Sequence, residues 1–238
     1  MKFKEVMKDM SPKEKLEYIW EYYKWHIIIL IFLLFMFGNI FYTKLTSKDY
    51  VLRGQFMNTI TESSEALQLE EAFLEKYPIN PKSEQIYFGT SLFYMPGTDY
   101  HALEVLTAQI AAGNVDFIMA DKATLDKFVY NEYFLDLSEI LTEEQMQAYS
   151  DNILYYDQAF AEYLDTIDPL SKEEFEIVYP DSAKPELMEK PVPIMLGIDS
   201  NEKLYELYPT KDQQYALGFV VTGKNLEKAT EFLEYVIN

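Results

Sequence analysis

The residues whose types could do chemistry stand where three predicted strands end. Asn58 and Thr59 close the strand expected at 51–58, Tyr94 follows the one at 85–93, and Asp121 and Lys122 follow the one at 115–120. Ligands of open α/β sheets bind outside the carboxyl ends of parallel strands. Amide, carboxylate and ammonium groups hydrogen-bond a polar solute, and an aromatic face can stack on it. The sequence therefore predicts a ligand-binding site at these five positions.

Each of these residues also has a local structural explanation. Asp121 stands where a helix N-cap is expected. Tyr94 precedes Pro96 and Gly97, which is typical of an aromatic residue packed on a turn. Asn58 and Thr59 suit the turn at the end of a strand. The sequence leaves both interpretations open for every position.

Motifs for catalysis and metal binding are missing from the sequence. His101 is the only histidine beyond the first 42 residues, no G-x-S-x-G or H-E-x-x-H motif accompanies it, and the chain has no cysteine. Neither a phosphate-binding loop nor a calcium loop is present. Paired carboxylates are too common in so acidic a chain to indicate glycosidase chemistry. We therefore predict no catalytic residue, no metal site, no cofactor and no enzyme activity.

The charge balance bears on possible partners. With 40 acidic and 20 basic residues the formal net charge is −20, which argues against nucleic acid as a partner. Residues 132–189 hold 16 acids and only two lysines. Such a stretch either attracts calcium or a cationic peptide, or forms a solvated face that keeps the domain soluble.

The elements that must position these residues alternate between strands and helices. Capping patterns mark helix starts, among them Ser63 or Ser64, Asp99, Asn225, and Thr142 with Gln145. Further strands are expected at 191–198 and 215–222, and the final helix turns Leu226, Ala229, Phe232, Leu233 and Val236 inward. The pattern predicts an α/β fold with a mostly parallel sheet flanked by helices.

A membrane anchor is predicted near the N-terminus. The run from His26 to Tyr42 contains no Asp, Glu, Lys or Arg, and with its neighbours it spans about 28 Å at about 1.5 Å per residue. Six lysines precede it, which places the N-terminus in the cytoplasm and the rest outside. A long polar lead and the lack of a cleavage site favour an uncleaved signal-anchor in the cell membrane. The expected domains are a cytoplasmic amphipathic segment (1–25), a transmembrane helix in the bilayer (26–43), a tether (44–50) and an extracellular domain (51–238).

The cytoplasmic segment has its own helical pattern. Ser11, Pro12 and Glu14 form an N-cap, a first-turn proline and a capping-box acid. Apolar residues then repeat at helical spacing. This fits either an interfacial helix or an inward extension of the transmembrane helix.

Three segments carry a resemblance to a known family. They are LTAQIAAGNVDFIMADKATLDKFVYNEYFLDLSEIL at 106–141, PVPIMLGID at 191–199 and YALGFVVTGKNLEKATEFLEYVIN at 215–238. In this order they resemble the extracellular solute-binding proteins of bacterial ABC importers, a periplasmic-binding-protein-like family often associated with sugars. The resemblance implies a binding lobe of that fold.

The chain departs from that family in two respects. Too few residues separate Leu154 from Lys190 for a complete second lobe, and the lipid-attached cysteine typical of Gram-positive members is absent. Two functions follow as hypotheses. The first is an abridged, membrane-anchored module that holds a sugar or peptide for an importer or sensor. The alternative is an ectodomain that has lost its ligand and serves as a scaffold or subunit of an envelope complex.

Overall fold

A computed structural model describes residues 10–60, 63–95, 100–167, 177–199, 201–210 and 213–237. The chain divides into two compact units, Met1–Lys48 and Asp49–Asn238. The proposed cap Asp99 lies outside the described residues, as do the first nine residues of the cytoplasmic segment.

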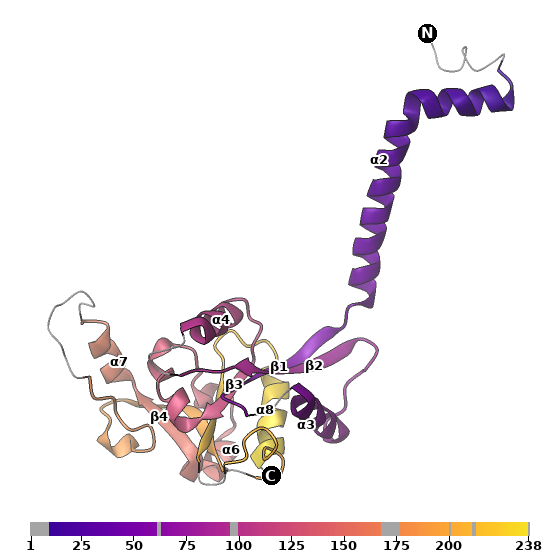
Figure 1. Cartoon of the computed structure of the whole chain (residues 1–238). Coiled ribbons are helices and arrows are strands. Elements are labelled where there is room, and N and C mark those ends of the chain that lie inside the picture. The colour runs from indigo at the N-terminus through magenta and orange to yellow at the C-terminus, as the bar shows by residue number, and fades with distance from the viewer. Residues whose placement is uncertain are drawn as a thin grey trace. The chain divides into compact units, whose positions relative to one another are not determined.

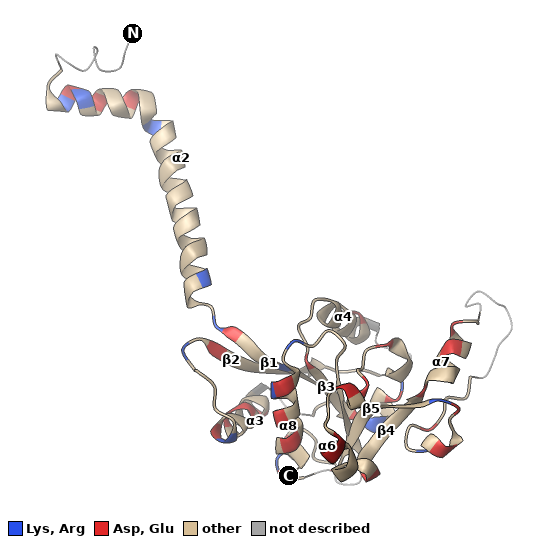
Figure 2. Ribbon diagram, turned by 180° about the vertical axis from the view of Figure 1, so that it is seen from behind, with Lys and Arg blue, Asp and Glu red and all other residues tan. Residues whose placement is uncertain are grey.

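The described part of the first unit is dominated by one helix, α2 (Pro12–Thr46). It begins with the predicted capping box: the Ser11 N–H donates to Glu14 Oε2 at 2.7 Å, and the Glu14 N–H to Ser11 Oγ at 3.4 Å. None of its residues is buried, and it is long and apolar enough to cross a membrane. The ribbon changes direction between its charged first part and the uncharged stretch that follows (Figure 2). Only Ser47 and Lys48 separate α2 from the first strand, so the connection is shorter than the predicted tether.

The second unit is built on a six-stranded sheet with the order β2-β1-β3-β6-β5-β4 (Figure 1). The strands are β1 (Asp49–Met57), β2 (Glu84–Leu92), β3 (Phe117–Asp121), β4 (Ile153–Asp157), β5 (Pro191–Ile198) and β6 (Tyr215–Phe219). The α-helices are α3 (Ser63–Lys76), α4 (Tyr100–Ala111), α5 (Lys122–Leu125), α6 (Glu143–Ala148), α7 (Gln158–Leu164) and α8 (Leu226–Ile237). Short 3-10 turns are η1 (Val129–Asn131), η2 (Leu137–Glu139), η3 (Ser150–Asn152) and η4 (Pro185–Leu187).

The α/β class is confirmed, but the prediction of a mostly parallel sheet is wrong. β1 runs parallel to β2 and β3, whereas β3–β6, β6–β5 and β5–β4 are antiparallel pairs. Helices continue to alternate with strands as far as β5, since α5 and α6 precede β4 and α7 precedes β5. Alternation alone does not make neighbouring strands parallel, because antiparallel neighbours need no crossover helix between them. The sheet is therefore mixed.

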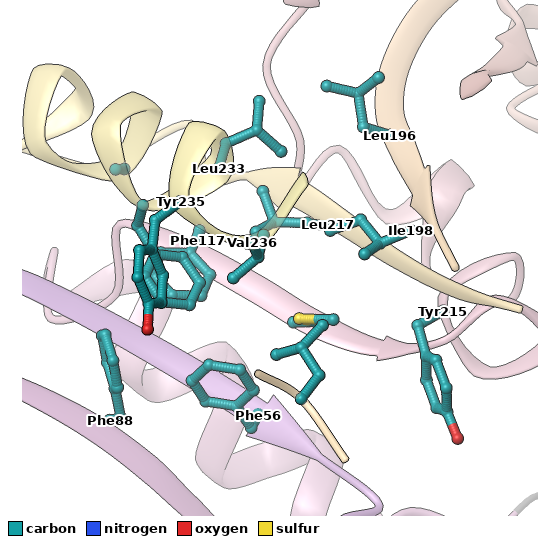
Figure 3. Close-up of a cluster of buried hydrophobic side chains, with 14 of the residues drawn as sticks. Phe56, Phe88, Phe117, Leu196, Ile198, Tyr215, Leu217, Leu233, Tyr235 and Val236 are labelled. Atoms are coloured by element: carbon teal, nitrogen blue, oxygen red, sulfur yellow. The ribbon is translucent and has the colours of Figure 1, made fainter. Parts of the chain in front are cut away.

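Alternating side chains bury both faces of the sheet. On β3, Phe117 and Met119 face a cluster that includes α3 and α8, while Ile118 and Ala120 face one that includes α4. The inward residues predicted for the last helix lie on the first face, where Phe232 stacks on Phe117 at 4.7 Å between ring centroids. Figure 3 shows aromatic side chains from several strands gathered beneath α8. These two clusters are the core that holds the strand ends in place.

Strand β4 was not predicted from the sequence. It lies at the start of the interval between Leu154 and Lys190, which is too short for a complete second lobe. β4 forms the last strand of the sheet, beside β5. α7 follows it directly, and Asp157 caps that helix. The described part of this interval thus extends the single sheet.

Two buried aspartates join distant segments. Asp116 accepts hydrogen bonds from the backbone N–H groups of Arg53, Lys224 and Asn225, at 2.8, 2.8 and 3.0 Å. It thereby ties β1 to the start of α8. Asp157 accepts from the N–H groups that precede β5 and from one in α7, at 2.9–3.0 Å.

Asp157 gives the domain a predicted sensitivity to acid. Burial works against its charged form, but the backbone N–H groups aimed at it outweigh burial and lower the pKa of the carboxyl from its ordinary 3.8. A lowered folded-state pKa stabilises the fold above the unfolded value, and this stabilisation is lost as pH falls through the folded value. We expect Asp157→Asn to lower the free energy of unfolding at pH 7 by about 1–3 kcal/mol, since its amide nitrogen cannot accept the Glu189 N–H.

Urea unfolding of the full chain between neutral pH and pH 3 measures this effect. The difference between wild type and Asp157→Asn should shrink as the pH drops. The matched control is Asp151→Asn, a substitution at an exposed position, which should show the same dependence of stability on pH as wild type. Equal pH profiles for wild type and Asp157→Asn would contradict the assignment.

Candidate functional site

A pocket of about 450 Å³ opens where β1, β2 and β3 end. Because β1 is parallel to both neighbours, the three carboxyl ends meet at the same edge of the sheet. The segment before β6 closes the other side. The side chains that line this strand-end pocket are Asn58, Ile60, Phe93, Tyr94, Met95, Asp121, Ala123, Thr124, Lys127, Tyr208, Thr210, Gln213 and Tyr215.

Asn58 connects the three segments around the pocket. Its Nδ2 donates to Asp121 Oδ2 at 3.1 Å and to Thr124 Oγ1 at 2.9 Å. Its Oδ1 accepts from the Tyr94 N–H at 2.7 Å. The backbone has φ of 55°, in the left-handed region that asparagine tolerates better than most residues. Asn58 is thus a positioning residue as well as part of the pocket wall.

Asp121 is the N-cap that its position predicts. Oδ1 accepts from the Thr124 N–H at 2.9 Å, and Oδ2 accepts from Thr124 Oγ1 at 2.8 Å besides the Asn58 amide. The residue is buried. A carboxylate oxygen can accept two hydrogen bonds, so Oδ1 keeps capacity for a donor from a ligand.

Tyr94 contributes an aromatic ring to the pocket. Its ring packs edge-on against Phe128, with centroids 5.0 Å apart and planes at 62°. Because Phe128 is fully buried, this contact anchors one side of a half-buried ring whose other side faces the pocket.

Thr59 and Lys122 lie outside the pocket lining. Thr59 is buried and donates its hydroxyl to the carbonyl of Thr90 at 3.1 Å. Lys122 directs its Nζ to Asp126 Oδ2 at 2.7 Å and lies 3.5 Å from Asp181 Oδ1. The structure therefore brings together three of the five predicted residues.

The contribution of residues before β6 to the strand-end pocket was not predicted from the sequence. Tyr208 is buried, and its hydroxyl lies 2.9 Å from the carbonyls of both Met57, the last residue of β1, and Met119, in the middle of β3. Burial raises its pKa well above the ordinary value, and the nearby Asp121 carboxylate adds to the effect. Burial also raises the pKa of Tyr215. Both phenols stay protonated at neutral pH and act as hydrogen-bond donors. Tyr215 opens a predicted strand, but no pattern marks Tyr208.

The outer rim of the pocket is apolar. Ile60, Phe93 and Met95 are 71%, 51% and 53% exposed. Exposed apolar side chains gathered at one place mark ligand or protein contacts more often than scattered ones do. The pocket combines a polar floor with an apolar rim.

This arrangement provides hydrogen bonding and stacking. The polar groups of the floor are largely engaged with one another, which fixes their orientation before any ligand arrives. Within the described ranges, no three His, Cys, Asp or Glu side chains gather closely enough to hold a metal ion. His101 is exposed in the first turn of α4 and is not among the lining residues.

Comparison with known proteins identifies no family for this chain. No protein-family model and no curated protein matches the chain. A solved structure of a de novo designed cysteine esterase, ECH19, is similar at 18% identity with a TM-score of 0.28. The match covers 52% of this chain and about a third (34%) of the designed one. So low a TM-score carries no information about fold or activity.

Proposed function

We propose that the chain is a membrane-anchored, non-catalytic binding module that holds a small solute, a sugar or a peptide, for an importer or sensor. The observation that supports it most is the strand-end pocket, where Asn58, Tyr94 and Asp121 come together from three separate strands. Pockets that bind small molecules are concave, with a few fixed polar groups among apolar ones. The strand-end pocket has this composition.

The character of the lining favours an amphipathic ligand. Asp121 Oδ1 and the exposed side chains of Thr210 and Gln213 offer hydrogen bonds to hydroxyl or peptide groups. Phe93 and Met95 at the rim would cover an apolar face of the same ligand. A sugar ring stacked on Tyr94, or a short peptide with an apolar side chain, satisfies both requirements.

The anchor and orientation belong to the same proposal. α2 has the length and composition of a membrane span, and the six lysines before its uncharged stretch support a cytoplasmic N-terminus. The binding unit, from Asp49 onward, is then outside the cell membrane. The resemblance of residues 106–141, 191–199 and 215–238 to importer-associated solute-binding proteins supports a transporter or sensor as the membrane partner.

The apolar rim also supports a second candidate. If the strand-end pocket holds no solute, Ile60, Phe93 and Met95 form an exposed apolar surface of the kind that mediates protein contacts. The domain would then be a scaffold or subunit in an envelope complex.

A thermal-shift screen of the full chain in lipid nanodiscs tests the proposal. The ligand classes are sugars, oligosaccharides, amino acids and short peptides. A ligand at 100 times its dissociation constant adds about 2.7 kcal/mol of stability, which is several degrees in melting temperature. Gln213→Ala and Tyr94→Leu should each reduce the shift. Gln68→Ala, at an exposed position of α3, is the matched control and should leave it intact.

Two results would count against the proposal. One is a cooperative melt with no shift for any class. The other is a shift that Gln68→Ala reduces as much as Gln213→Ala does. Crosslinking in intact cells through the rim residues would then test the scaffold. Asp121 is left unchanged in these variants because it caps α5 and its loss would alter folding.

A further inference from the structure

A second pocket, of about 370 Å³, lies beside α7. β6 is antiparallel to β3, so the end of β6 lies at the opposite edge of the sheet from the strand-end pocket. Val221, just after β6, lines the second pocket. We call it the tyrosine–acid pocket. Its lining residues are Val129, Tyr130, Glu132, Phe134, Tyr156, Gln158, Ala161, Glu162, Leu164, Asp165, Ile194 and Val221.

The charged side chains that the structure describes in the lining of this pocket are all negative. Glu132, Glu162 and Asp165 contribute carboxylates, and none of the described lining residues is a lysine or arginine. Lys190 Nζ donates to both carboxylate oxygens of Glu162 at 3.2 Å, but both side chains are more than half exposed, so the pair is weak. One ammonium against three carboxylates leaves the pocket negative. Figure 2 shows acidic positions on α7.

The wall of the pocket is aromatic. The rings of Tyr130 and Tyr156 have centroids 6.0 Å apart and planes at 74°, so they present surfaces in two directions. Phe160 and Tyr179 pack against Tyr130 at 5.3 and 5.5 Å and hold its ring in place. The face of an aromatic ring attracts a cation within about 6 Å of its centroid.

The carboxylates of the pocket also affect the phenol of Tyr156. Burial raises the pKa of the Tyr156 phenol, and nearby carboxylates, including those of Glu132 and Glu162, raise it further. The phenol of Tyr156 therefore stays protonated at neutral pH, and its ring attracts a cation through its π face.

The separation of the carboxylates indicates what size of cation the pocket fits. Nowhere in the described ranges do three acidic or imidazole side chains come close enough to share a metal ion. The carboxylates instead surround a volume far larger than a bare ion. Separate charges around aromatic walls suit a cation whose charge is spread over several carbon atoms.

We propose that the tyrosine–acid pocket binds a small organic cation, a quaternary ammonium, with its charged group packed against the rings of Tyr130 and Tyr156 on the side that lines the pocket. The carboxylates of Glu132 and Asp165 lie around it and supply long-range attraction. This site is separate from the strand-end pocket and does not depend on the function proposed for that pocket.

Calorimetric titration of the full chain in non-ionic detergent with choline chloride tests the proposal, with sodium chloride keeping the ionic strength constant. Choline should bind at least about tenfold more tightly than its neutral analogue, in which a tert-butyl group replaces the trimethylammonium group. Tetramethylammonium should compete with choline.

Variants locate the binding in the pocket. Tyr156→Leu should weaken choline binding about fivefold or more, while Tyr156→Phe, which keeps the ring, should stay within about twofold. Glu132→Gln should weaken it about threefold. The matched control is Glu139→Gln, which removes the same charge at an exposed position outside the lining. If Tyr156→Leu does not fold, Tyr156→Phe and Glu132→Gln still decide the question.

Several outcomes would overturn the proposal. The proposal fails if choline gives no heat of binding with a folded chain, or if choline and its neutral analogue bind with equal affinity. It also fails if Glu139→Gln weakens choline binding as much as Glu132→Gln does. Displacement of choline by calcium chloride at matched ionic strength would show general charge attraction, and would equally overturn it.

Discussion

Asp116→Ala is expected to lower the free energy of unfolding by about 3 kcal/mol, since three partly buried N–H groups lose their acceptor and each such loss costs about 1 kcal/mol or more. The carboxylate is 2% exposed and accepts three backbone N–H groups, from Arg53, Lys224 and Asn225. The Asn225 side-chain amide also donates to it, at 3.1 Å. Alanine leaves these partly buried donors without their acceptor, and β1 and the start of α8 lose their common anchor.

Urea unfolding of the full chain, followed by tyrosine fluorescence, measures this loss. Asp116→Asn keeps the shape and one acceptor oxygen, so it should be intermediate. Asp151→Ala, at an exposed position, should change stability by less than about 0.5 kcal/mol. An Asp116→Ala variant as stable as Asp151→Ala would show that the N–H groups find other partners.

Phe117→Ala is expected to lower the free energy of unfolding by about 3–5 kcal/mol, the range for a fully buried phenylalanine. The ring is fully buried, stacks on Phe232 with planes 13° apart, and meets Phe56 at 5.7 Å. Its removal opens a cavity between β3 and α8. The same unfolding measurement applies, and Phe93→Ala, at a half-exposed position, is the matched control.

Gly54 provides an independent check on the same ring. A Cβ at position 54 would lie 2.2 Å from Cζ of Phe117, so the ring fills the space that a side chain would need. Gly54→Ala should therefore destabilise the protein by about 1–3 kcal/mol. In the Phe117→Ala background the added methyl group enters the cavity and should cost less, with a coupling of at least about 1 kcal/mol. Additivity within about 0.5 kcal/mol would contradict this packing.

Features set by neighbouring residues were predictable from the sequence. The capping boxes of Ser11 with Glu14 and of Thr142 with Gln145 are both present, because each joins residues three apart. The Asp121 cap is of the same kind. Helix α8 shows the expected inward face, because its apolar spacing follows the helical period.

Features set by distant residues were not predictable in this way. The runs that form β5 and β6 are apolar on both faces, and such a pattern does not specify strand direction. β4 was not predicted because it is only five residues long and its sequence, ILYYD, shows no alternation of apolar and polar residues. The role of Asp116 depends on N–H groups far away in sequence, and Tyr208 reaches the strand-end pocket through carbonyls that carry no side-chain signal.

For the candidate site, local spacing located the strand ends but not the directions of the side chains. Successive residues point to different sides, so Asn58 and Asp121 line the pocket while Thr59 and Lys122 turn away. The tyrosine–acid pocket draws on residues from Val129 to Val221, and only the acidic character of part of it was visible beforehand.

The contact between Phe117 and Phe232 also has a consequence for biogenesis. α8 is the last described element to leave the ribosome, yet its ring completes the core around β1 and β3, and the backbone at its start occupies the acceptors of Asp116. The apolar strands made first therefore stay uncovered through most of synthesis. Contacts between segments so far apart in sequence form slowly, and uncovered strands are prone to aggregate. We therefore expect aggregation of the nascent chain to be suppressed only after α8 has been made and has docked on the sheet.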